Sequence, residues 1–305
     1  MTIANGAQHS LHYVAEVTYG TTPSSPTFKP LPHTGTTLAV TKDAVESEKI
    51  RGDRQVEDFR HGNKTVGGDI TAELEYGAFD DFLEAALCGA WSNDILKAGT
   101  TRRSFSLQRK FADLATPEFH TYKGCEINTL ALSVSPNAMV GTTFGIIGKD
   151  LTLATAAIAN STFSAAAVET PFDSFTGSIT EGGSSIATVT AIEMTLENGI
   201  EPLFSVGSQT TNRPAIGRSR LTGTLTTYFE NKTLYEKFLN ETSSSIVLTL
   251  TDADGNDYVI TIPSVKYNSG QPDVAGEGAI TIAMEFIGLY NTSDASQIKI
   301  TRSTA

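Results

Sequence analysis

Five histidines are the first side chains to consider for metal binding or proton transfer. Only His9 and His12 share a short spacing, and they lie in a polar N-terminal stretch. The others, His33, His61 and His120, are scattered along the chain. A closed zinc site needs four nitrogen or sulfur ligands at characteristic spacings. The pair is therefore interpreted as an incidental surface feature, and no metal centre is expected.

The acidic motif TDADGNDY, at 251–258, is similar to the first half of a calcium-binding loop. Asp252, Asp254 and Asn256 have the alternating spacing of such a loop, but the glutamate at its twelfth position is missing. Two alternating runs, SIVLTLT and YVITIP, flank the motif. Because Asp-Gly favours tight turns between strands, a hairpin turn is the better interpretation.

The remaining reactive side chains do not combine into a catalytic set. Asp80 and Asp81 are adjacent on a predicted helix, where neighbouring residues do not face each other. Neither Cys88 nor Cys125 has a histidine-based activating motif nearby, and both are predicted to be reduced. No phosphate-binding glycine loop, nucleophile elbow or glycosidase carboxylate pair stands out. We expect no enzymatic activity and no cofactor.

The composition narrows the function classes further. The chain has 305 residues, enough for two domains, with 39% hydrophobic and 18% charged residues and a net charge of −12. We expect no tight sequence-specific binding of nucleic acid from such an acidic chain, because that binding needs clustered Lys and Arg. No apolar run is long enough to span a membrane, and MTIANGAQHS lacks the features of a secretion signal.

A strand pattern that runs directly into a helix pattern occurs twice. In the first copy, 70–87, apolar and polar residues alternate and then give way to a helical stripe. Asp80 and Asp81 would occupy the first helical turn, and Gly89 would be the left-handed residue after the helix. The predicted packing residues of this helix are Phe79, Phe82, Leu83 and Leu87.

The second copy, 221–239, repeats the pattern with other residues. Asn231 is the expected N-cap and Asn240 closes the helix. Its predicted packing residues are Leu234, Tyr235, Phe238 and Leu239. The alignment places Leu74 with Leu225. Similar strands precede both copies, TTLAVTK and AIEMTLE, and similar strands ending in Gly close them, TTFGIIG and IAMEFIG.

These matches indicate a duplicated β-rich domain with one helix in each copy. The predicted parts are an extended N-terminal arm with few ladder bonds (1–35), a first domain (36–150), an Ala/Ser/Thr-rich linker (151–173), a second domain (174–292) and a polar C-terminal tail (293–305). Asp43–Gly68 in the first domain is expected to be a long, highly charged loop, either a contact surface or a solvated flap.

The chain resembles the tail tube proteins of long-tailed, non-contractile bacteriophages. The segments that carry the resemblance include TYGTTPSSPTFKPLPHTG, ESEKIRGDRQVEDFRHGNKTVGGDITAELEYGAFDDFLEAALCG, GTTRRSFSLQRKF, FTGSITEGGSSIATVT, TTNRPAIGRSRLTGTLTTYFENKTLYEKFLNE and DGNDYVITIPSVKYNSGQPDVAGEG. The resemblance implies tandem β-sandwich tube domains, each flanked by one α-helix, whose sheets join in a ring as an annular β-barrel. Such rings stack into a hollow tube through which DNA leaves the capsid. Two domains per chain imply trimeric, pseudo-sixfold rings, with six chains and an outer second domain as the alternative.

The resemblance also assigns candidate surfaces. Polar residues opposite the buried face of the strands are expected to line an acidic lumen that repels phosphate; an outer face is the alternative. These lumen candidates are Thr71, Glu73, Glu75, Glu193, Thr222, Thr224, Thr226 and Glu285. The charged loop is the candidate for contacts between rings, through Glu46, Glu48, Lys49, Arg51, Asp53, Arg54, Glu57, Asp58 and Arg60.

The implied partners are further copies of the chain, the tape-measure protein, the tail terminator, the tail-tip proteins and passing phage DNA, with no membrane. The implied location is the virion tail, after synthesis in the host cytoplasm. Two alternative hypotheses of function remain. One is a carbohydrate-binding β-sandwich or adhesin, and the other is another virion ring protein such as a tail terminator or head-decoration protein. An adhesin would need a platform of aromatic side chains to bind sugar, and the sequence has one tryptophan, Trp91.

Overall fold

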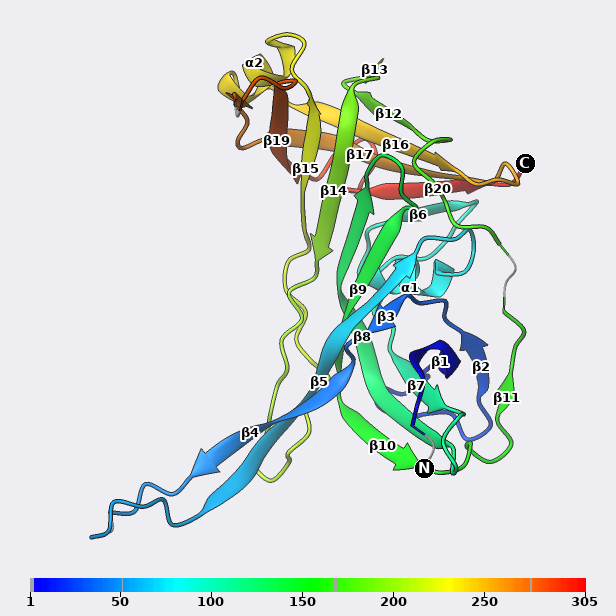
Figure 1. The fold of residues 1–305 in the computed structure, drawn as a ribbon, viewed down its shortest axis with the longest axis vertical. Coiled ribbons are helices and arrows are strands. Elements are labelled where there is room, and N and C mark those ends of the chain that lie inside the picture. The colour runs from blue at the N-terminus through cyan, green and yellow to red at the C-terminus, as the bar shows by residue number, and fades with distance from the viewer. Residues whose placement is uncertain (1–2, 51, 167–168, 275) are drawn as a thin grey trace.

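The protein is described here from a computed structural model that covers residues 3–50, 52–166, 169–274 and 276–305. It is mainly β, with two short α-helices and a 3-10 turn at Gly6–Gln8 among the described residues. The strands are linked by hydrogen bonds into one large sheet that is not closed into a barrel (Figure 1). No helix in the described part of the chain is long and apolar enough to cross a membrane.

A central antiparallel sheet runs through both halves of the molecule (Figure 1). Its strands, in spatial order, are β4 (Ala39–Glu46), β5 (Phe59–Glu73), β9 (Gly141–Gly148), β8 (Glu118–Val134), β14 (Val189–Glu197), β15 (Arg220–Tyr228) and β19 (Thr281–Gly288). The short strand β3 (Gly35–Thr36) continues the β4 edge, and β18 (Pro272–Asp273) pairs with β19 at the other edge. The predicted opening and closing strands of both copies therefore belong to one sheet, with β5 between β4 and β9 and β15 between β14 and β19.

The order of pairing repeats along the sheet. The first half reads β4-β5-β9-β8, and the second reads β14-β15-β19 followed by β17 (Asp257–Tyr267). Ile70 lies opposite Phe144, and Leu225 lies opposite Met284, each four residues before the closing glycine. The structural equivalent of Leu225 is thus Ile70. The sequence alignment, which paired Leu225 with Leu74, is wrong by four residues.

A second layer of the first half contains the N-terminal residues. It comprises β2 (Thr27–Pro30), β1 (His9–Ala15), β7 (Phe105–Phe111), the first part of β8, and β10 (Asp150–Ala154), with β11 (Thr162–Phe163) beside β2. The expectation of an arm with few ladder bonds is wrong, because β1 is paired along both edges and buries Leu11 and Tyr13. The segment after Asp150 also forms strands, and Phe172 within it is fully buried.

The second layer of the other half crosses the central sheet at its upper end in Figure 1. It is built from β13 (Ser184–Ser185), β12 (Ser178–Glu181), β16 (Ser244–Thr251), β17, β20 (Lys299–Ser303) and β6 (Ile95–Lys97). The predicted polar tail is therefore partly a strand, since β20 lies between β17 and β6. Arg302 of this strand bridges Asp80 and Asp94, which ties the end of the chain to the first half.

The two helices differ in burial. Helix α1 (Asp80–Ala86) follows Phe79, and the predicted packing residues Phe79, Phe82, Leu83 and Leu87 are all buried. Helix α2 (Thr233–Leu239) has no buried residue: Leu234, Tyr235 and Phe238 are half-buried. Leu239 departs from the expected packing because 59% of it is exposed. After α1 the left-handed residue is Cys88, with φ 49°, in place of the expected Gly89.

The charged segment Asp43–Gly68 is a hairpin and not an irregular loop. The β4–β5 ladder continues outward until Glu46 lies opposite Phe59, and only residues 47–58 connect the strands. Figure 1 shows this hairpin projecting well beyond the body of the molecule. At its base Gly68 has φ 136°, and a Cβ there would lie 2.6 Å from the Thr37 carbonyl oxygen, so this position requires glycine.

Candidate functional site

One face of the central sheet is polar from edge to edge. Along β14, for example, Ile192, Met194 and Leu196 are buried, while the alternate residues are exposed. The same alternation in β5, β15 and β19 places the apolar set in the core and the other set on a shared surface. We call this surface the polar face. It is the candidate functional site because it spans both halves of the chain.

The register brings three acidic lumen candidates into one row across the polar face. The row runs Glu73, Gly141, Ser133, Glu193, Thr224 and Glu285, each residue lying directly opposite the next. The row runs across six strands, perpendicular to them, because directly opposite residues in an antiparallel sheet lie side by side. Glu73, Glu193 and Glu285 are exposed.

The threonine candidates form a neighbouring row. That row runs Thr71, Thr143, Ala131, Thr195 and Thr222, again as directly opposite residues. Thr226 lies beyond the acidic row, opposite Ala191 and Ala283. Glu75 is separate from both rows, since it lies past the end of β5 and forms an isolated bridge with Pro171. Seven of the eight candidates thus share the polar face.

Several residues of the polar face were not predicted from the sequence. Ser133, Thr143, Thr195 and Glu197 lie in the rows or next to them. Ser133 and Thr143 lie in β8 and β9, which are buried on both faces over much of their length, so period-two alternation gives no clear signal there. Thr195 lies in β14, where the exposed residues do alternate with buried ones. Glu197 alternates with buried residues of β14 and could have been found by extending the pattern already used for Glu193.

The polar face carries mainly negative charge. Glu73, Glu193, Glu197 and Glu285 are exposed on it, and Arg220, opposite Glu197, is a basic residue at its margin. The pKa of Glu75 is raised by burial and by the nearby charges of Glu73 and Glu169. Two shallow hollows, of about 550 and 370 Å³, lie on this face, and Glu193 lines both. Such a surface offers acceptor oxygens and hydroxyl groups but no cluster of cations for phosphate.

The candidate residues for contacts between rings lie on the projecting hairpin. Glu46 and Arg60 belong to its strands, and Glu48, Lys49, Asp53, Arg54, Glu57 and Asp58 to the connection, while Arg51 lies outside the described residues. Lys49 pairs with Glu57 at 3.5 Å, and Arg60 pairs with Asp58 at 3.7 Å. The hairpin also exposes four apolar side chains, Val45, Ile50, Val56 and Phe59. Exposed apolar groups among mixed charges are typical of a contact surface.

The corresponding loop of the second half lies against the first half. In this segment, 198–219, the Gln209 carbonyl accepts the Lys64 backbone N–H at 2.7 Å. Asn198 donates from its side chain to the carbonyls of Ala86 and Ile127. Arg213 reaches Glu126, a carboxylate that Arg102 also contacts. This packing was not predicted, because the sequence gives no signal for which distant segment a loop will contact.

The residues first considered for chemistry are occupied by structural contacts. The Asp252 carboxylate accepts the backbone N–H groups of Asp254 and Asn256, as the predicted hairpin turn requires. Glu169 brings a third carboxylate, and the three carboxylates at Glu169, Asp252 and Asp254 have oxygen atoms within 4.8 Å of one another. Asp80 accepts from Tyr258. Trp91 lies under the Arg302 guanidinium, 4.5 Å from the ring centroid, and is no open platform for a sugar.

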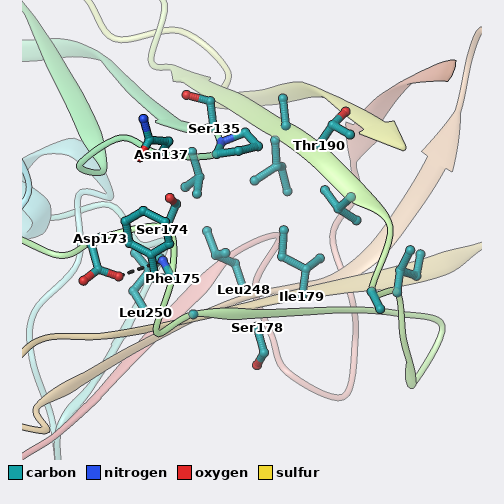
Figure 2. Close-up of a pocket in the computed structure, with 18 of the residues that line it drawn as sticks. Ser135, Asn137, Asp173, Ser174, Phe175, Ser178, Ile179, Thr190, Leu248 and Leu250 are labelled. Atoms are coloured by element: carbon teal, nitrogen blue, oxygen red, sulfur yellow. Dashed lines mark hydrogen bonds between the residues drawn. The ribbon is translucent and has the colours of Figure 1, made fainter. Parts of the chain in front are cut away.

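A separate cavity of about 380 Å³ opens between the two layers of the second half (Figure 2). Ile179, Leu248 and Leu250 point into it, and Asp173 lies at its rim beside Phe175. The Asp173 carboxylate accepts the Phe175 N–H at 2.7 Å and two hydrogen bonds from Thr176, which lower its pKa. Its oxygen is therefore committed to a turn, and the cavity combines an apolar floor with polar residues such as Ser135, Asn137 and Thr190.

Comparisons with known proteins give the family of the chain. A family model described as phage tail tube protein matches residues 6–288. The search of curated proteins finds no match. Among solved structures, the cryo-EM structure of the anti-feeding prophage cap, a tube terminating cap, is 14% identical over 47% of this chain and 97% of that chain. The TM-score of this match is 0.32. The family match extends over nearly the whole sequence, and the chain belongs to the phage tail tube protein family.

Proposed function

We propose that the protein is the major structural subunit of the tail tube of a phage with a long, non-contractile tail. Copies of the chain form rings, and the rings stack into a hollow tube through which the genome passes. Membership of the tail tube family supports this function. The long antiparallel sheet with one polar face supports it independently, because a tube wall needs a surface that water and DNA can meet.

The observation that carries the proposal is the pairing of β8 with β14. Through it the central sheet continues from one repeat into the next without a gap. Each chain then supplies two neighbouring wall segments, from tandem tail-tube domains at about 36–150 and 174–292. Three chains complete a pseudo-sixfold ring whose sheets close into an annular β-barrel, and closure pairs the free edges. A ring of six chains would instead need the second repeat outside the wall, where β14 could not continue the inner sheet.

The polar face is assigned to the lumen. Its acidic row, Glu73, Glu193 and Glu285, repels phosphate and keeps DNA from adhering to the wall. The apolar face of the same sheet packs into the core, where α1 contributes its buried side chains. The partners that follow from this role are neighbouring copies, the tape-measure protein, the tail terminator and the tail-tip proteins. The place of action is the virion tail, after synthesis in the host cytoplasm.

Electron microscopy of the concentrated protein tests the proposal. Hollow tubes with three pairs of unequal lobes in end-on averages are the expected result. Six equivalent lobes would retain the tube but move the second repeat out of the wall. Closed rings that never stack would favour another virion ring protein, such as a terminator. Monomers that bind sugar and form neither rings nor tubes would contradict the proposal and favour an adhesin.

A further inference from the structure

The two halves of the central sheet join along a seam inside the chain. In this seam β8 pairs with β14, from Ile192 opposite Val134 to Glu197 opposite Thr129. The outer edges of the sheet have no comparable partner within the described part of the chain. There β3 and β4 pair with β5, and β18 pairs with β19. The chain thus contains one completed seam and the two edges that a second seam would need.

The register shows which residues of the β4 edge correspond to β14. Val66 and Leu221 hold equivalent positions, because each lies opposite the glycine that ends β9 or β19. Their partners on the other side are Val40 and Leu196. Val40 is therefore the equivalent of Leu196, and residues 36–41 of the free edge correspond to residues 192–197 of the seam.

The opposite edge is matched in the same way. Ser133 and Asp273 are equivalent, because each lies opposite the first residue of β9 or β19. The preceding residues, Leu132 and Pro272, are equivalent as well, since Pro272 lies opposite Ile282 as Leu132 lies opposite Thr142. Residues 269–274 of the free edge therefore correspond to residues 129–134 of β8.

We propose that residues 36–41 of one chain pair antiparallel with residues 269–274 of a second copy, in the register of the β8–β14 seam. This inference rests on the proposed ring and names the backbone segments that close it. The directly opposite residues in the new seam are Thr36 and Val274, Thr37 and Asp273, Leu38 and Pro272, Ala39 and Gln271, Val40 and Gly270, and Thr41 and Ser269.

The Leu38 backbone provides an independent reason for this register. The Thr37 N–H donates to the Asp69 carbonyl, so the backbone polar groups of Thr37 point toward β5. Those of the next residue, Leu38, then point toward the free edge. The Leu38 carbonyl, however, already accepts hydrogen bonds from Arg109 at 2.9 Å and from the Tyr122 hydroxyl at 3.0 Å. A carbonyl has two lone pairs, so this acceptor does not need a donor from the next chain.

Pro272 supplies the matching half. The Asn268 N–H donates to the Glu285 carbonyl. The backbone N–H and C=O groups of Glu285, Ala283 and Thr281 therefore point toward β18, because these groups alternate in direction along a strand. Asp273, opposite Thr281, then faces β19, and Pro272 faces the free edge. Proline has no N–H to donate. In the proposed register Pro272, which has no donor, meets the Leu38 carbonyl, whose lone pairs are already filled, and a shift of two residues would lose this match.

The same two residues protect the chain before assembly. An edge proline and an occupied edge carbonyl each remove a point of attachment for a foreign strand. The two edges differ from each other, so copies join head to tail, and such contacts close into a ring when the rotation permits. The edges are therefore specific for one another and poor templates for pairing with themselves.

Mixed disulfide trapping in assembled tubes tests the register. One preparation carries Ala39→Cys, the other carries Gln271→Cys, and the two are co-assembled and oxidised. The pair is predicted to be directly opposite and not hydrogen-bonded, with Cα atoms about 4.5 Å apart, inside the range that a disulfide allows. We expect a covalent dimer on a non-reducing gel. The native cysteines, Cys88 and Cys125, are buried and unpaired, and single-variant preparations control for them.

Thr41→Cys mixed with Gln271→Cys is the matched control. It places the thiols on the same face but diagonally, about 7–8 Å apart, beyond disulfide reach. Tubes in which this pair cross-links as well as the first, or in which the first gives no dimer, would overturn the register. Thr41→Cys mixed with Ser269→Cys is a second in-register pair in case the first impairs assembly. If the unsubstituted protein forms no tubes at all, the proposed function fails, whereas tubes without these cross-links contradict only the seam.

Discussion

Glu126 lies where three distant parts of the chain meet. Its side chain is only 3% exposed and contacts both Arg102 and Arg213, the latter from the loop of the second half. Removing one side of a buried ion pair leaves an uncompensated charge. We expect Glu126→Gln to lower the free energy of unfolding by about 3 kcal/mol, measured by urea denaturation of the unassembled chain.

Glu57→Gln serves as the matched control for this prediction. Glu57 pairs with Lys49 on the projecting hairpin, and both side chains are substantially exposed. Exposed pairs contribute about 0–1 kcal/mol, so this variant should unfold at nearly the same urea concentration as the original protein. Equal effects of the two substitutions would show that burial does not set the value of the Glu126 contacts.

His9 is the centre of a directional hydrogen-bond chain. Arg109 donates to its Nε2 at 3.1 Å, so its proton lies on Nδ1, which donates to His33 at 2.9 Å. The other nitrogen of His33 donates to the Leu31 carbonyl. Burial lowers the pKa of His9 from 6.5 to about 4, and the charges of Arg109, His33, His12 and His120 act in the same direction.

The lowered pKa of His9 predicts a loss of stability in acid. Between pH 6.5 and about pH 4 the unfolded histidine is protonated while the folded one is not. Unfolding then takes up a proton, so the free energy of unfolding falls as the pH is lowered through this window. Urea midpoints at pH 7, 5.5 and 4.5 measure it. His9→Gln should flatten part of the decline, whereas His61→Gln, on the exposed hairpin, should not; identical profiles would contradict the prediction.

At the scale of elements, the two helices occupy equivalent places with different attachments. Helix α1 packs Phe82 against Phe105 and Phe144. Helix α2 buries none of its residues and is tied through Lys237 to the buried carboxylate of Glu181, at 2.6 and 2.7 Å. One helix is therefore part of the apolar core, whereas the other is attached through a half-buried apolar stripe and an ion pair.

This difference predicts unequal costs for the same truncation. Phe82→Ala should lower the free energy of unfolding by about 3–5 kcal/mol, because it opens a cavity in a closed core. Phe238→Ala, in the half-buried apolar stripe of α2, should cost only about 1–2 kcal/mol. Urea denaturation of the unassembled chain compares them directly. A larger loss for Phe238→Ala would mean that the apolar stripe, and not the Glu181–Lys237 pair, holds α2.

The projecting hairpin gives a second prediction at this scale. Because Glu46 lies opposite Phe59, replacing 48–57 by Asn-Gly shortens the hairpin without disturbing its paired strands. We expect rings that no longer stack, seen as single discs by electron microscopy. A full-length variant with neutral residues throughout 48–57 separates charge from length. Normal tubes from the shortened protein would remove the hairpin from the contacts between rings.

The sequence predicted the elements that have a clear period. The alternation in 191–197 and 221–226 correctly identified β14 and β15, and the two strand-like runs that end in Gly, TTFGIIG and IAMEFIG, correctly identified β9 and β19. It failed for β1, whose sequence HSLHYVA mixes polar residues into a paired strand, and for the outer part of β5, where both faces are wet. The row of acids follows from the strand register, which depends on bulges such as the one between Ile127 and Thr129 in the β8–β9 ladder and cannot be read from local patterns.

At the scale of the whole molecule, the polar face predicts how tubes treat DNA. Replacing Glu73, Glu193 and Glu285 by Lys turns the acidic row into a basic one. We expect such tubes to retain labelled DNA in co-sedimentation, with retention falling steeply as salt is raised, and virions carrying them to release DNA more slowly.

A second triple variant controls for total charge. Glu118, Glu230 and Glu241 are exposed acids outside the two rows of the polar face, and their replacement by Lys changes the net charge equally. If these residues lie outside the lumen, DNA release should stay at the original rate. Equal slowing by both triple variants would show that overall charge, and not the polar face, governs passage.

The β8–β14 seam also has a consequence for the kinetics of assembly. A ring of single-repeat subunits must form every one of its seams by collision between free molecules. In the proposed ring half of the seams are already made when each chain folds, and they cannot dissociate while the chain is folded. The yield of rings then depends on a lower power of the subunit concentration. Joining two repeats in one chain thus allows tubes to begin while the subunit is still scarce in the cell.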